Sequence, residues 1–217
     1  IEIHPADAME LGIREADLAE VYNELGSVVV RALITDRVSP KSVFLPMHWT
    51  DQFASNARVN ALVPAVTDPY SGQPASKNMP CSVRRFAASY YGFAVTRDKP
   101  DLSAFDYWAI SKCTDGWRIE LAIEDPTAEY VQITKKILGD GDVLDYQDKS
   151  KSEFRLAVFE GSATKGILYL SQAPVLVSRS WLVNQLNALH DSKISRYRLL
   201  AGRPGTEGQD IGAIVCS

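Results

Sequence analysis

"DLAEVYNELGSVVVRALIT", residues 17–35, is the stretch that decides the fold of the first part of this chain. Its second half is short and β-branched, and Gly26, just before it, can close a tight turn. The first half contains good helix formers and is ambiguous by itself. The turn and the second half together predict two antiparallel strands, at about 18–22 and 28–35.

Short elements on either side of this hairpin extend the same pattern. Residues 4–12, "HPADAMELG", are typical of a short helix, because a proline suits the first turn and Gly12 supplies a left-handed stop. A turn at Pro40 leads to a third strand at 43–45, and "CSVRRFAA", residues 81–88, is predicted to be a fourth. One helix and several short strands around a long excursion indicate a small β-barrel.

A long irregular segment connects the third and fourth strands. Residues 44–77 read "FLPMHWTDQFASNARVNALVPAVTDPYSGQPASK", which is rich in Asn, Asp, Pro, Ser and Gly. Loops of this length are uncommon in compact domains and are usually functional or disordered. The segment also holds too many hydrophobic side chains for a solvated tail. We therefore interpret it as a binding loop, and we expect residues 51–80 to be partly disordered without their ligand.

From about residue 88 the pattern changes to a mixture of helices and strands. Residues 125–139 predict a helix with an N-terminal cap, which ends at Gly139. The other predicted elements are a β-hairpin and two further helices, at 153–171, 178–189 and 192–202. This combination is typical of a small α+β module.

A cluster of aspartates follows the first of these helices. Its members are Asp140, Asp142, Asp145 and Asp148. A calcium-binding loop has Gly at its sixth position and Glu at its twelfth, whereas here Gly is second and Glu153 is fourteenth. We therefore predict a solvated loop over residues 140–153.

Composition narrows the class of protein. The chain has 217 residues and a formal net charge of −4. This charge and the lack of a Lys/Arg-rich run argue against nucleic-acid binding, and no apolar stretch approaches the roughly 20 residues of a membrane-spanning helix. The start has no signal-peptide pattern. We expect Cys81 and Cys113 to be reduced thiols of a cytoplasmic protein. Cys81, Cys113 and Cys216 are too far apart for a metal-binding pair.

Two spaced stretches resemble a known domain. They are "VVVRALITDRVSPKSVFLPMHW", residues 28–49, and "VNALVPAVTDPYSGQPASKNMPCSVRR", residues 59–85. Their shared features are a strand pair with a central glycine, an Arg-x-x-Pro turn, an apolar-His-Trp strand end, Asn-x-Leu, and Asp-Pro-x-Ser-x-x-Pro followed by a lysine. This order resembles the molybdopterin-guanine-dinucleotide-binding domain of the dimethyl-sulfoxide-reductase-like molybdenum oxidoreductases. The resemblance implies a double-psi β-barrel over residues 1–86.

The rest of the chain is similar to the C-terminal half of assimilatory, cytoplasmic nitrate reductases. The stretches concerned are "SYYGFAVTR", "FDYWAISK", "GWRIELA", "LLAGRPG" and "IGAIVCS". The resemblance implies a small α+β module over 87–202 and a linker over 203–217 that leads to an iron–sulfur segment opening with Cys-x-Cys. Cys216 then matches a first cluster ligand. We expect the chain to be a segment of a longer enzyme.

The same resemblance implies an activity. The whole enzyme would reduce nitrate to nitrite with two electrons, using two molybdopterin guanine dinucleotides with molybdenum, iron–sulfur clusters and an electron-donor protein. The metal ligand and the substrate pocket would lie in upstream domains of the same enzyme. We therefore expect the isolated segment to bind no cofactor and to be inactive.

A dinucleotide brings two phosphates and a purine edge into the protein, and buried charge needs donors in place of water. Lys, His and amide side chains supply such donors. The resemblance implies that the long loop provides the contacts, and the candidate residues are His48, Trp49, Asn60, Asp68, Gln73 and Lys77. Structural roles are the alternative for five of them: His48 as a half-exposed histidine at a strand end, Trp49 as packing, Asn60 as a hydrogen-bond partner of the loop backbone, Asp68 as a turn former, and Lys77 as a solvated surface charge.

Two other functions stay open. The same barrel is expected in formate-dehydrogenase-like molybdenum enzymes, although the residues after 87 favour nitrate. A stand-alone β-barrel binding module without a redox role is the second alternative.

Overall fold

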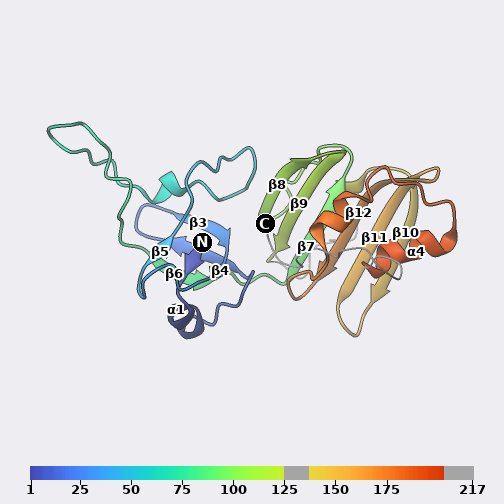
Figure 1. Ribbon diagram of the computed structural model, residues 1–217, viewed down its shortest axis with the longest axis horizontal. Coiled ribbons are helices and arrows are strands. Elements are labelled where there is room, and N and C mark those ends of the chain that lie inside the picture. Colours follow the sequence, from blue (N-terminus) through green and yellow to red (C-terminus); the bar gives the residue numbers. More distant parts are fainter. Residues whose placement is uncertain (125–136, 203–217) are drawn as a thin grey trace. The chain divides into compact units, whose positions relative to one another are not determined.

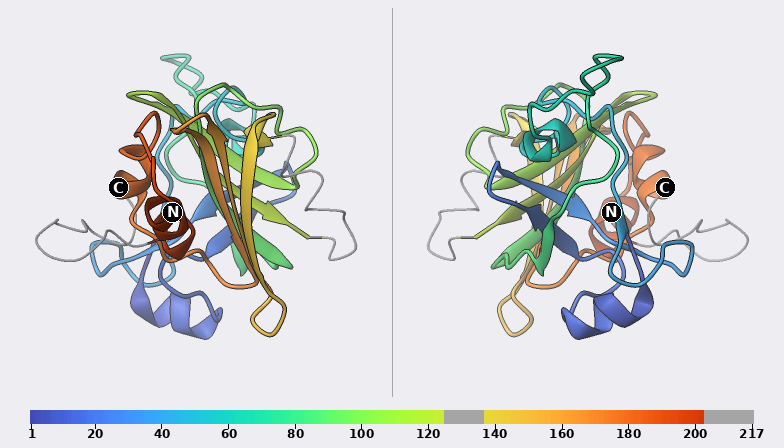
Figure 2. Two further views of the ribbon diagram at one scale, coloured as in Figure 1. Left: turned by 90° about the vertical axis from the view of Figure 1, so that its right-hand side faces the viewer. Right: turned by 90° about the vertical axis from the view of Figure 1, so that its left-hand side faces the viewer.

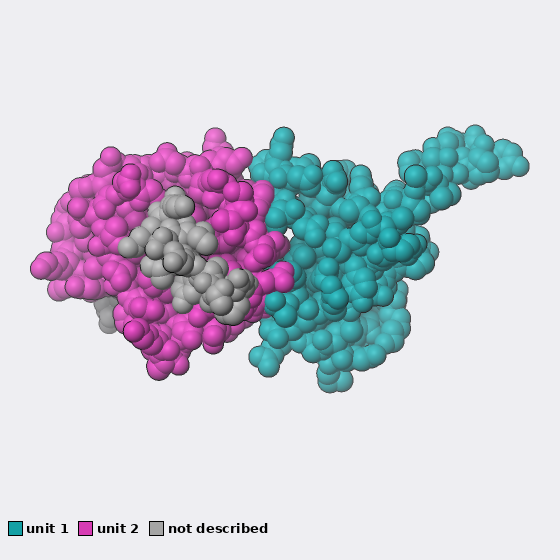
Figure 3. Space-filling view, turned by 180° about the vertical axis from the view of Figure 1, so that it is seen from behind, with its two compact units in different colours: residues 1–87 teal, residues 88–217 magenta. Residues whose placement is uncertain are grey.

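The computed structural model describes residues 1–124 and 137–202 and divides into two compact units, Ile1–Ala87 (unit 1) and Ala88–Ser217 (unit 2) (Figure 3). Most of the predicted helix at 125–139 and the whole of the segment after residue 202 lie outside the described residues. Within the described ranges, no helix is both long and apolar enough to cross a membrane. This part of the chain is mostly β, with few helices.

Unit 1 is built from two small three-stranded sheets (Figure 1). In spatial order, the first contains β4 (Leu33–Ile34), β1 (Glu2–Ile3) and β5 (Val43–Phe44). The second contains β3 (Ser27–Arg31), β2 (Leu18–Tyr22) and β6 (Ser82–Arg85). Helix α1 (Pro5–Glu10) and the 3-10 helix η1 (Val59–Leu62) complete the unit. One apolar core draws on both sheets, with Ile3, Val21, Val28 and Leu62 among its members.

The hairpin predicted from residues 17–35 is present. β2 and β3 pair antiparallel, from Leu18 opposite Arg31 to Tyr22 opposite Ser27. The other edge of β2 pairs with β6, which confirms the predicted fourth strand. Three strands of this unit therefore form where the β-branched pattern predicts them.

The prediction of one continuous strand over 28–35 is wrong. The chain leaves the second sheet at Ala32, whose N–H donates to the Asp17 carbonyl at 2.8 Å, and β4 then pairs parallel with β1. Asp17 is buried at this corner, and its carboxylate accepts from Arg14 N–H and from Arg85 Nε, both at 3.0 Å. The bend lets one β-branched run supply a strand to each sheet.

Helix α1 confirms the helix predicted at 4–12. His4 is its N-cap, and its Nδ1 accepts from Ala6 N–H at 3.2 Å. Asp7 in the first turn is buried and accepts from Lys41 N–H at 2.6 Å. This carboxylate ties the helix to the turn before β5.

Unit 2 contains a six-stranded antiparallel sheet in the spatial order β10-β11-β12-β7-β9-β8. Along the chain the strands are β7 (Tyr90–Thr96), β8 (Tyr107–Cys113), β9 (Gly116–Ile123), β10 (Asp142–Asp148), β11 (Glu153–Glu160) and β12 (Ala163–Ser171). The hairpin predicted at 153–171 is β11 with β12. Because β12 also pairs with β7, the early and late strands form one sheet.

Both faces of this sheet are covered. On one face, Leu121 and Leu168 pack in a core with Phe105 and Leu138. On the other face lie helices α3 (Arg179–Val183) and α4 (Lys193–Ala201), drawn in orange and red in Figure 2. Burial on both faces explains why these strands read as nearly continuous apolar runs.

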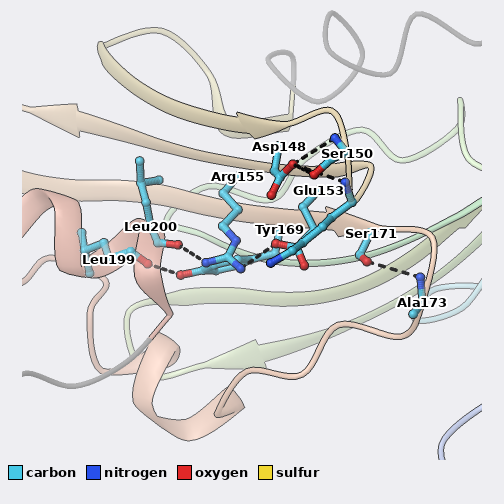
Figure 4. Close-up of polar contacts among 10 residues, drawn as sticks. Asp148, Ser150, Glu153, Arg155, Tyr169, Ser171, Ala173, Leu199 and Leu200 are labelled. Carbon is cyan, nitrogen blue, oxygen red and sulfur yellow. Dashed lines mark hydrogen bonds and ion pairs between the residues drawn. The ribbon is translucent and has the colours of Figure 1, made fainter.

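A row of side chains crosses the helix-covered face from strand to strand. Tyr146, Arg155, Tyr169 and Phe93 are successive partners across β10, β11, β12 and β7. The Arg155 guanidinium lies 5.7 Å from the centre of each tyrosine ring and donates to the Leu200 carbonyl at 2.7 Å (Figure 4). The Tyr169 hydroxyl donates to the neighbouring Leu199 carbonyl. Side chains of the sheet therefore donate to two carbonyls in the last turn of α4, where the Leu199 carbonyl also accepts from the N–H of Gly202 at 3.0 Å.

Arg179 joins α3 to the same face. Its guanidinium donates to both carboxylate oxygens of Glu120 on β9, at 3.0 and 3.2 Å. It lies 4.5 Å from the ring centre of Phe93 and donates to the carbonyls of Val175 and Val177. A bidentate and stacked arginine of this kind is not replaceable by lysine.

The predicted helix at 178–189 is longer than the observed one. α3 ends at Val183, and the chain then turns through Asn187, whose φ is 60°. It returns to the sheet, where Thr164 N–H donates to the Ala188 carbonyl at 3.1 Å. Pairing with the sheet therefore replaces the last helical turns. The helix predicted at 192–202 is confirmed as α4, with Ser192 as its N-cap.

The prediction of a solvated loop over 140–153 is wrong. Residues 142–148 form β10, which pairs with β11 along its whole length. Asp142 and Asp145 nevertheless stay exposed, and hydrogen bonds from Ser150 lower the pKa of Asp148. Among the described residues, no group of His, Cys, Asp and Glu could hold a metal ion. Exposed charge on this strand suits the edge of a sheet.

Candidate functional site

The long segment between β5 and β6 has two halves, and the first is anchored to the core of unit 1. In residues 51–63, the Asn56 carbonyl accepts from Val29 N–H on β3 at 2.7 Å. Val59 and Leu62 of η1 are buried, as are Ala54 and Ala57. This anchored half is therefore a fixed part of the unit, despite its irregular sequence.

The turn between β2 and β3 holds η1 in place. The Asn23 Oδ1 accepts from Leu25 N–H at 2.9 Å and from Gly26 N–H at 3.3 Å, while its Nδ2 donates to the Leu62 carbonyl at 2.8 Å. Gly26 comes so close that a Cβ on it would lie 2.9 Å from the Ala61 carbonyl oxygen. The turn and η1 therefore meet backbone to backbone.

The second half, residues 64–78, forms an arm that stands away from the rest of unit 1 (Figures 1 and 3). Thr67 and Pro74 form an isolated antiparallel bridge at its middle, and Ala75 N–H donates to the Val66 carbonyl at 3.0 Å. Tyr70 at its tip is 98% exposed. The arm is held mainly by its own backbone contacts.

Asp68 builds the tip of the arm. Its Oδ1 accepts from Tyr70 N–H at 3.0 Å, from Ser71 N–H at 2.8 Å and from Ser71 Oγ at 3.0 Å. The Ser71 bonds, followed by the Tyr70 bond, lower the pKa of Asp68. The carboxylate is therefore ionised and engaged in its own turn, as expected of an Asp before Pro69.

The six predicted site residues all occupy exposed positions on this segment. His48, with a φ of 80°, and Trp49 precede the anchored half. Asn60 is an exposed residue of η1, in which Val59 and Leu62 are buried. The remaining three of the six candidates lie on the arm: Asp68, Gln73 and Lys77. Asp68 and Gln73 are joined by a backbone hydrogen bond of 2.9 Å. The structure thus places three candidates on or next to the anchored half and three on the arm.

The sequence does not predict the contact of Asn23 with η1. The Asn-x-x-Gly turn itself is a recognisable signal. The partner of its amide is not, because the two residues are 39 positions apart in the chain. Contacts at this separation depend on the tertiary fold.

Pockets in the described part of unit 2 include two small ones, with volumes of about 150 and 200 Å³. The first lies beside the turn from β10 to β11 and is lined by Tyr90, Asp148 and Glu153, among others. The second lies at the end of α4 and is lined by Arg155 and Tyr169, among others. Neither pocket contains any of the predicted site residues, so the candidate site remains the segment between β5 and β6.

Comparison with known proteins gives a family match for the part of the chain that contains this segment. Residues 1–80 match the family described as the Molydopterin dinucleotide binding domain. The match includes the anchored half and the arm, together with all six predicted site residues. It confirms the resemblance predicted from the spaced motifs of residues 28–85. No solved structure matches the chain at a significant level.

Individual relatives extend the match. The nitrate reductase of Klebsiella oxytoca is 30% identical over 217 residues, which is 100% of this chain and 25% of the relative. The assimilatory nitrate reductase catalytic subunit of Bacillus subtilis is 34% identical over 84 residues, 39% of this chain and 11% of the relative. The F420-dependent formate dehydrogenase 1 subunit alpha of Methanococcus maripaludis is 38% identical over 55 residues, 25% of this chain and 8% of the relative. The chain thus spans a quarter or less of the length of these relatives.

Proposed function

We propose that unit 1 is a double-psi β-barrel that binds molybdopterin guanine dinucleotide, and that the protein containing this chain is an assimilatory nitrate reductase. The observation that carries the proposal is the 30% identity to a nitrate reductase along all 217 residues. The match of residues 1–80 to a dinucleotide-binding family supports the assignment of the ligand to unit 1. The proposed division is a barrel at 1–86, a module at 87–202 and a linker at 203–217.

The donor set of the candidate site fits this ligand. Two phosphates require cationic or amide donors, and charge-assisted bonds are the strong kind. The Lys77 ammonium and the amides of Asn60 and Gln73 are exposed on the segment and can supply these bonds. The carboxylate of Asp68 already accepts three hydrogen bonds within its own turn, so we assign it to the shape of the arm.

In this proposal the residues of this chain bind and orient the dinucleotide, and the cofactor provides the redox chemistry. The bound molybdenum cofactor, with two such dinucleotides, supplies oxygen-atom transfer. Asn60 and Lys77 hold the dinucleotide, while His48, Trp49 and Gln73 flank it. In the complex with the dinucleotide, these residues would exclude water from the phosphates.

The choice of nitrate over formate rests on unit 2. Relatives that act on other substrates match within a limited part of the chain, as the formate dehydrogenase of Methanococcus maripaludis does over 55 residues. The match to the nitrate reductase of Klebsiella oxytoca continues through the whole of unit 2. A formate-dehydrogenase-like enzyme is therefore the second candidate, supported by matches to a smaller part of the chain.

Other parts of the enzyme complete the proposal. Upstream domains of the same enzyme provide the metal ligand and the substrate pocket, and iron–sulfur clusters pass electrons from a donor protein in the cytoplasm. Cys216, which lies outside the described residues, is proposed as a ligand of one cluster. The 217-residue chain alone would not reduce nitrate.

The test measures cofactor content directly. The enzyme is purified as wild type and with Asn60→Ala and Lys77→Ala, singly and combined, and acid-released GMP and molybdenum are measured per polypeptide. Each lost charge-assisted or amide bond is expected to weaken cofactor retention by about tenfold, so GMP and molybdenum fall together.

Lys149→Ala is the matched control for this test, because Lys149 is an exposed lysine of unit 2. It is expected to retain the wild-type GMP content. A combined Asn60→Ala and Lys77→Ala enzyme with full GMP and molybdenum would show that these residues do not hold the cofactor.

A further inference from the structure

The orientation of Asn60 depends on a very short element. η1 contains four residues, and its own bonds include Ala61 N–H to the Arg58 carbonyl at 2.9 Å and Val63 N–H to the Asn60 carbonyl at 3.2 Å. A single 3-10 turn has poor hydrogen-bond geometry and does not persist without outside support. Whatever holds η1 in place therefore also holds Asn60.

Burial supplies part of that support. Val59 and Leu62 are buried on either side of Asn60, which itself is exposed. These two side chains fix which face of η1 points to the core. They do not fix the position of η1 along the surface of the core, which depends on the polar contacts of η1.

Asn23 makes such a contact at the end of η1. Its Nδ2 donates to the Leu62 carbonyl, which as the last carbonyl of a helical turn lacks an internal partner. The Oδ1 of the same amide accepts two N–H groups of the β2–β3 turn. Because two acceptor contacts lie on one side of the amide and a donor contact on the other, the amide bridges the turn and η1.

We propose that Asn23 is a positioning residue for cofactor binding, because its hydrogen bond to the Leu62 carbonyl sets the place of η1 and hence of the Asn60 amide. This inference rests on the proposed function, in which Asn60 contacts the dinucleotide. Asn23 itself acts through η1 and does not contact the cofactor. Gly26 assists by allowing the Ala61 carbonyl to come close.

The variant Asn23→Asp separates the two roles of the amide. A carboxylate still accepts from the N–H groups of Leu25 and Gly26, but it cannot donate to the Leu62 carbonyl. In the purified enzyme, we expect amide exchange at Ala61 and Val63 to become about tenfold faster, and acid-released GMP to fall below half of the wild-type content. Exchange at Val29, which is held by Asn56 instead, should stay unchanged.

Two comparisons make the result specific. Asn184→Asp introduces the same chemical change at an exposed amide of unit 2 and should leave both the exchange rates and the GMP content at wild-type levels. Gly26→Ala displaces η1 without altering charge, since its Cβ would lie 2.9 Å from the Ala61 carbonyl oxygen. It should lower GMP in the same way, and it decides the question if Asn23→Asp fails to fold.

The outcomes distinguish the inference from the function on which it rests. If Asn60→Ala keeps full GMP, the proposed contact of Asn60 is overturned and the role of Asn23 with it. If Asn60→Ala loses GMP while Asn23→Asp and Gly26→Ala keep it, the positioning role alone is overturned. Faster exchange throughout unit 1, including Val29, would show a general loss of stability instead and would also overturn it.

Discussion

His190 is buried in unit 2, with an exposed fraction of 8%. Its ring meets Phe159 edge-on, with centroids 6.3 Å apart, and among the described residues neither ring nitrogen has a hydrogen-bond partner. Burial, and then the Arg196 guanidinium, lower the pKa of His190, with Asp191 opposing them. The imidazole is therefore neutral in the folded chain at neutral pH.

Unfolding returns this ring to water, where its pKa is about 6.5. As the pH falls below that value, the unfolded chain takes up a proton that the folded chain does not, so the free energy of unfolding decreases. We predict that urea unfolding will show lower stability at about pH 5.5 than at about pH 7.5, by up to about 1.4 kcal/mol per pH unit from this group. The variant His190→Phe should lack this contribution.

His48 provides the control for this prediction. His48→Asn removes an imidazole from an exposed position whose φ of 80° suits asparagine, so it tests whether the loss of pH dependence is specific to the buried ring of His190. Equal pH dependences in wild type and His190→Phe would contradict the prediction.

At the scale of elements, the two halves of the segment between β5 and β6 should differ in stability. Amides that hold the anchored half, such as those of Val29 and Ala61, lie against the core, whereas those of Gly72 and Ala75 close bonds within the exposed arm. We predict that hydrogen exchange in the 217-residue chain without cofactor will be at least about tenfold slower in the anchored half than in the arm. Equal protection in both halves would contradict this difference. Disorder without the ligand, expected from the sequence over residues 51–80, is therefore now predicted only for the arm, residues 64–78.

The sequence predicts elements well where local pattern and tertiary packing agree. The β2–β3 hairpin follows from a turn at Gly26 and the β-branched run after it, and α4 follows from its N-cap and from Gly202 at its end. Prediction from the sequence fails where backbone pairing determines the end of a strand. At Ala32, for example, a β-branched run bends from one sheet into another. The same holds for residues 184–189, which continue a helical pattern but turn back to pair with the sheet.

The candidate site was predictable in part for a related reason. Residue types such as the Asn60 amide and the Lys77 ammonium, in spaced motifs, indicate the ligand and the segment that carries it. The division of that segment into an anchored half and an arm depends on long-range contacts such as Val29 with Asn56. Sequence pattern does not reveal contacts of that kind.

At the scale of the whole molecule, each unit has apolar clusters of its own. The cluster of unit 1 contains Ile3 and Leu62, while the two clusters of unit 2 lie on opposite faces of its sheet. A six-stranded sheet with both faces covered buries enough apolar surface for a domain of this size. Unit 2 therefore has the physical requirements of an independent folding unit.

We predict that residues 88–217, expressed alone, will fold cooperatively, as judged by near-UV circular dichroism and a single urea transition. The variant Arg179→Ala should lower the free energy of unfolding by about 3 kcal/mol, because it leaves the Glu120 carboxylate without its bidentate partner in a largely buried place. Arg97→Ala removes an arginine whose partner, Glu160, is exposed to solvent, and should lower the free energy of unfolding much less than Arg179→Ala. Compact but non-cooperative behaviour of the wild-type segment would show that its core requires the rest of the chain.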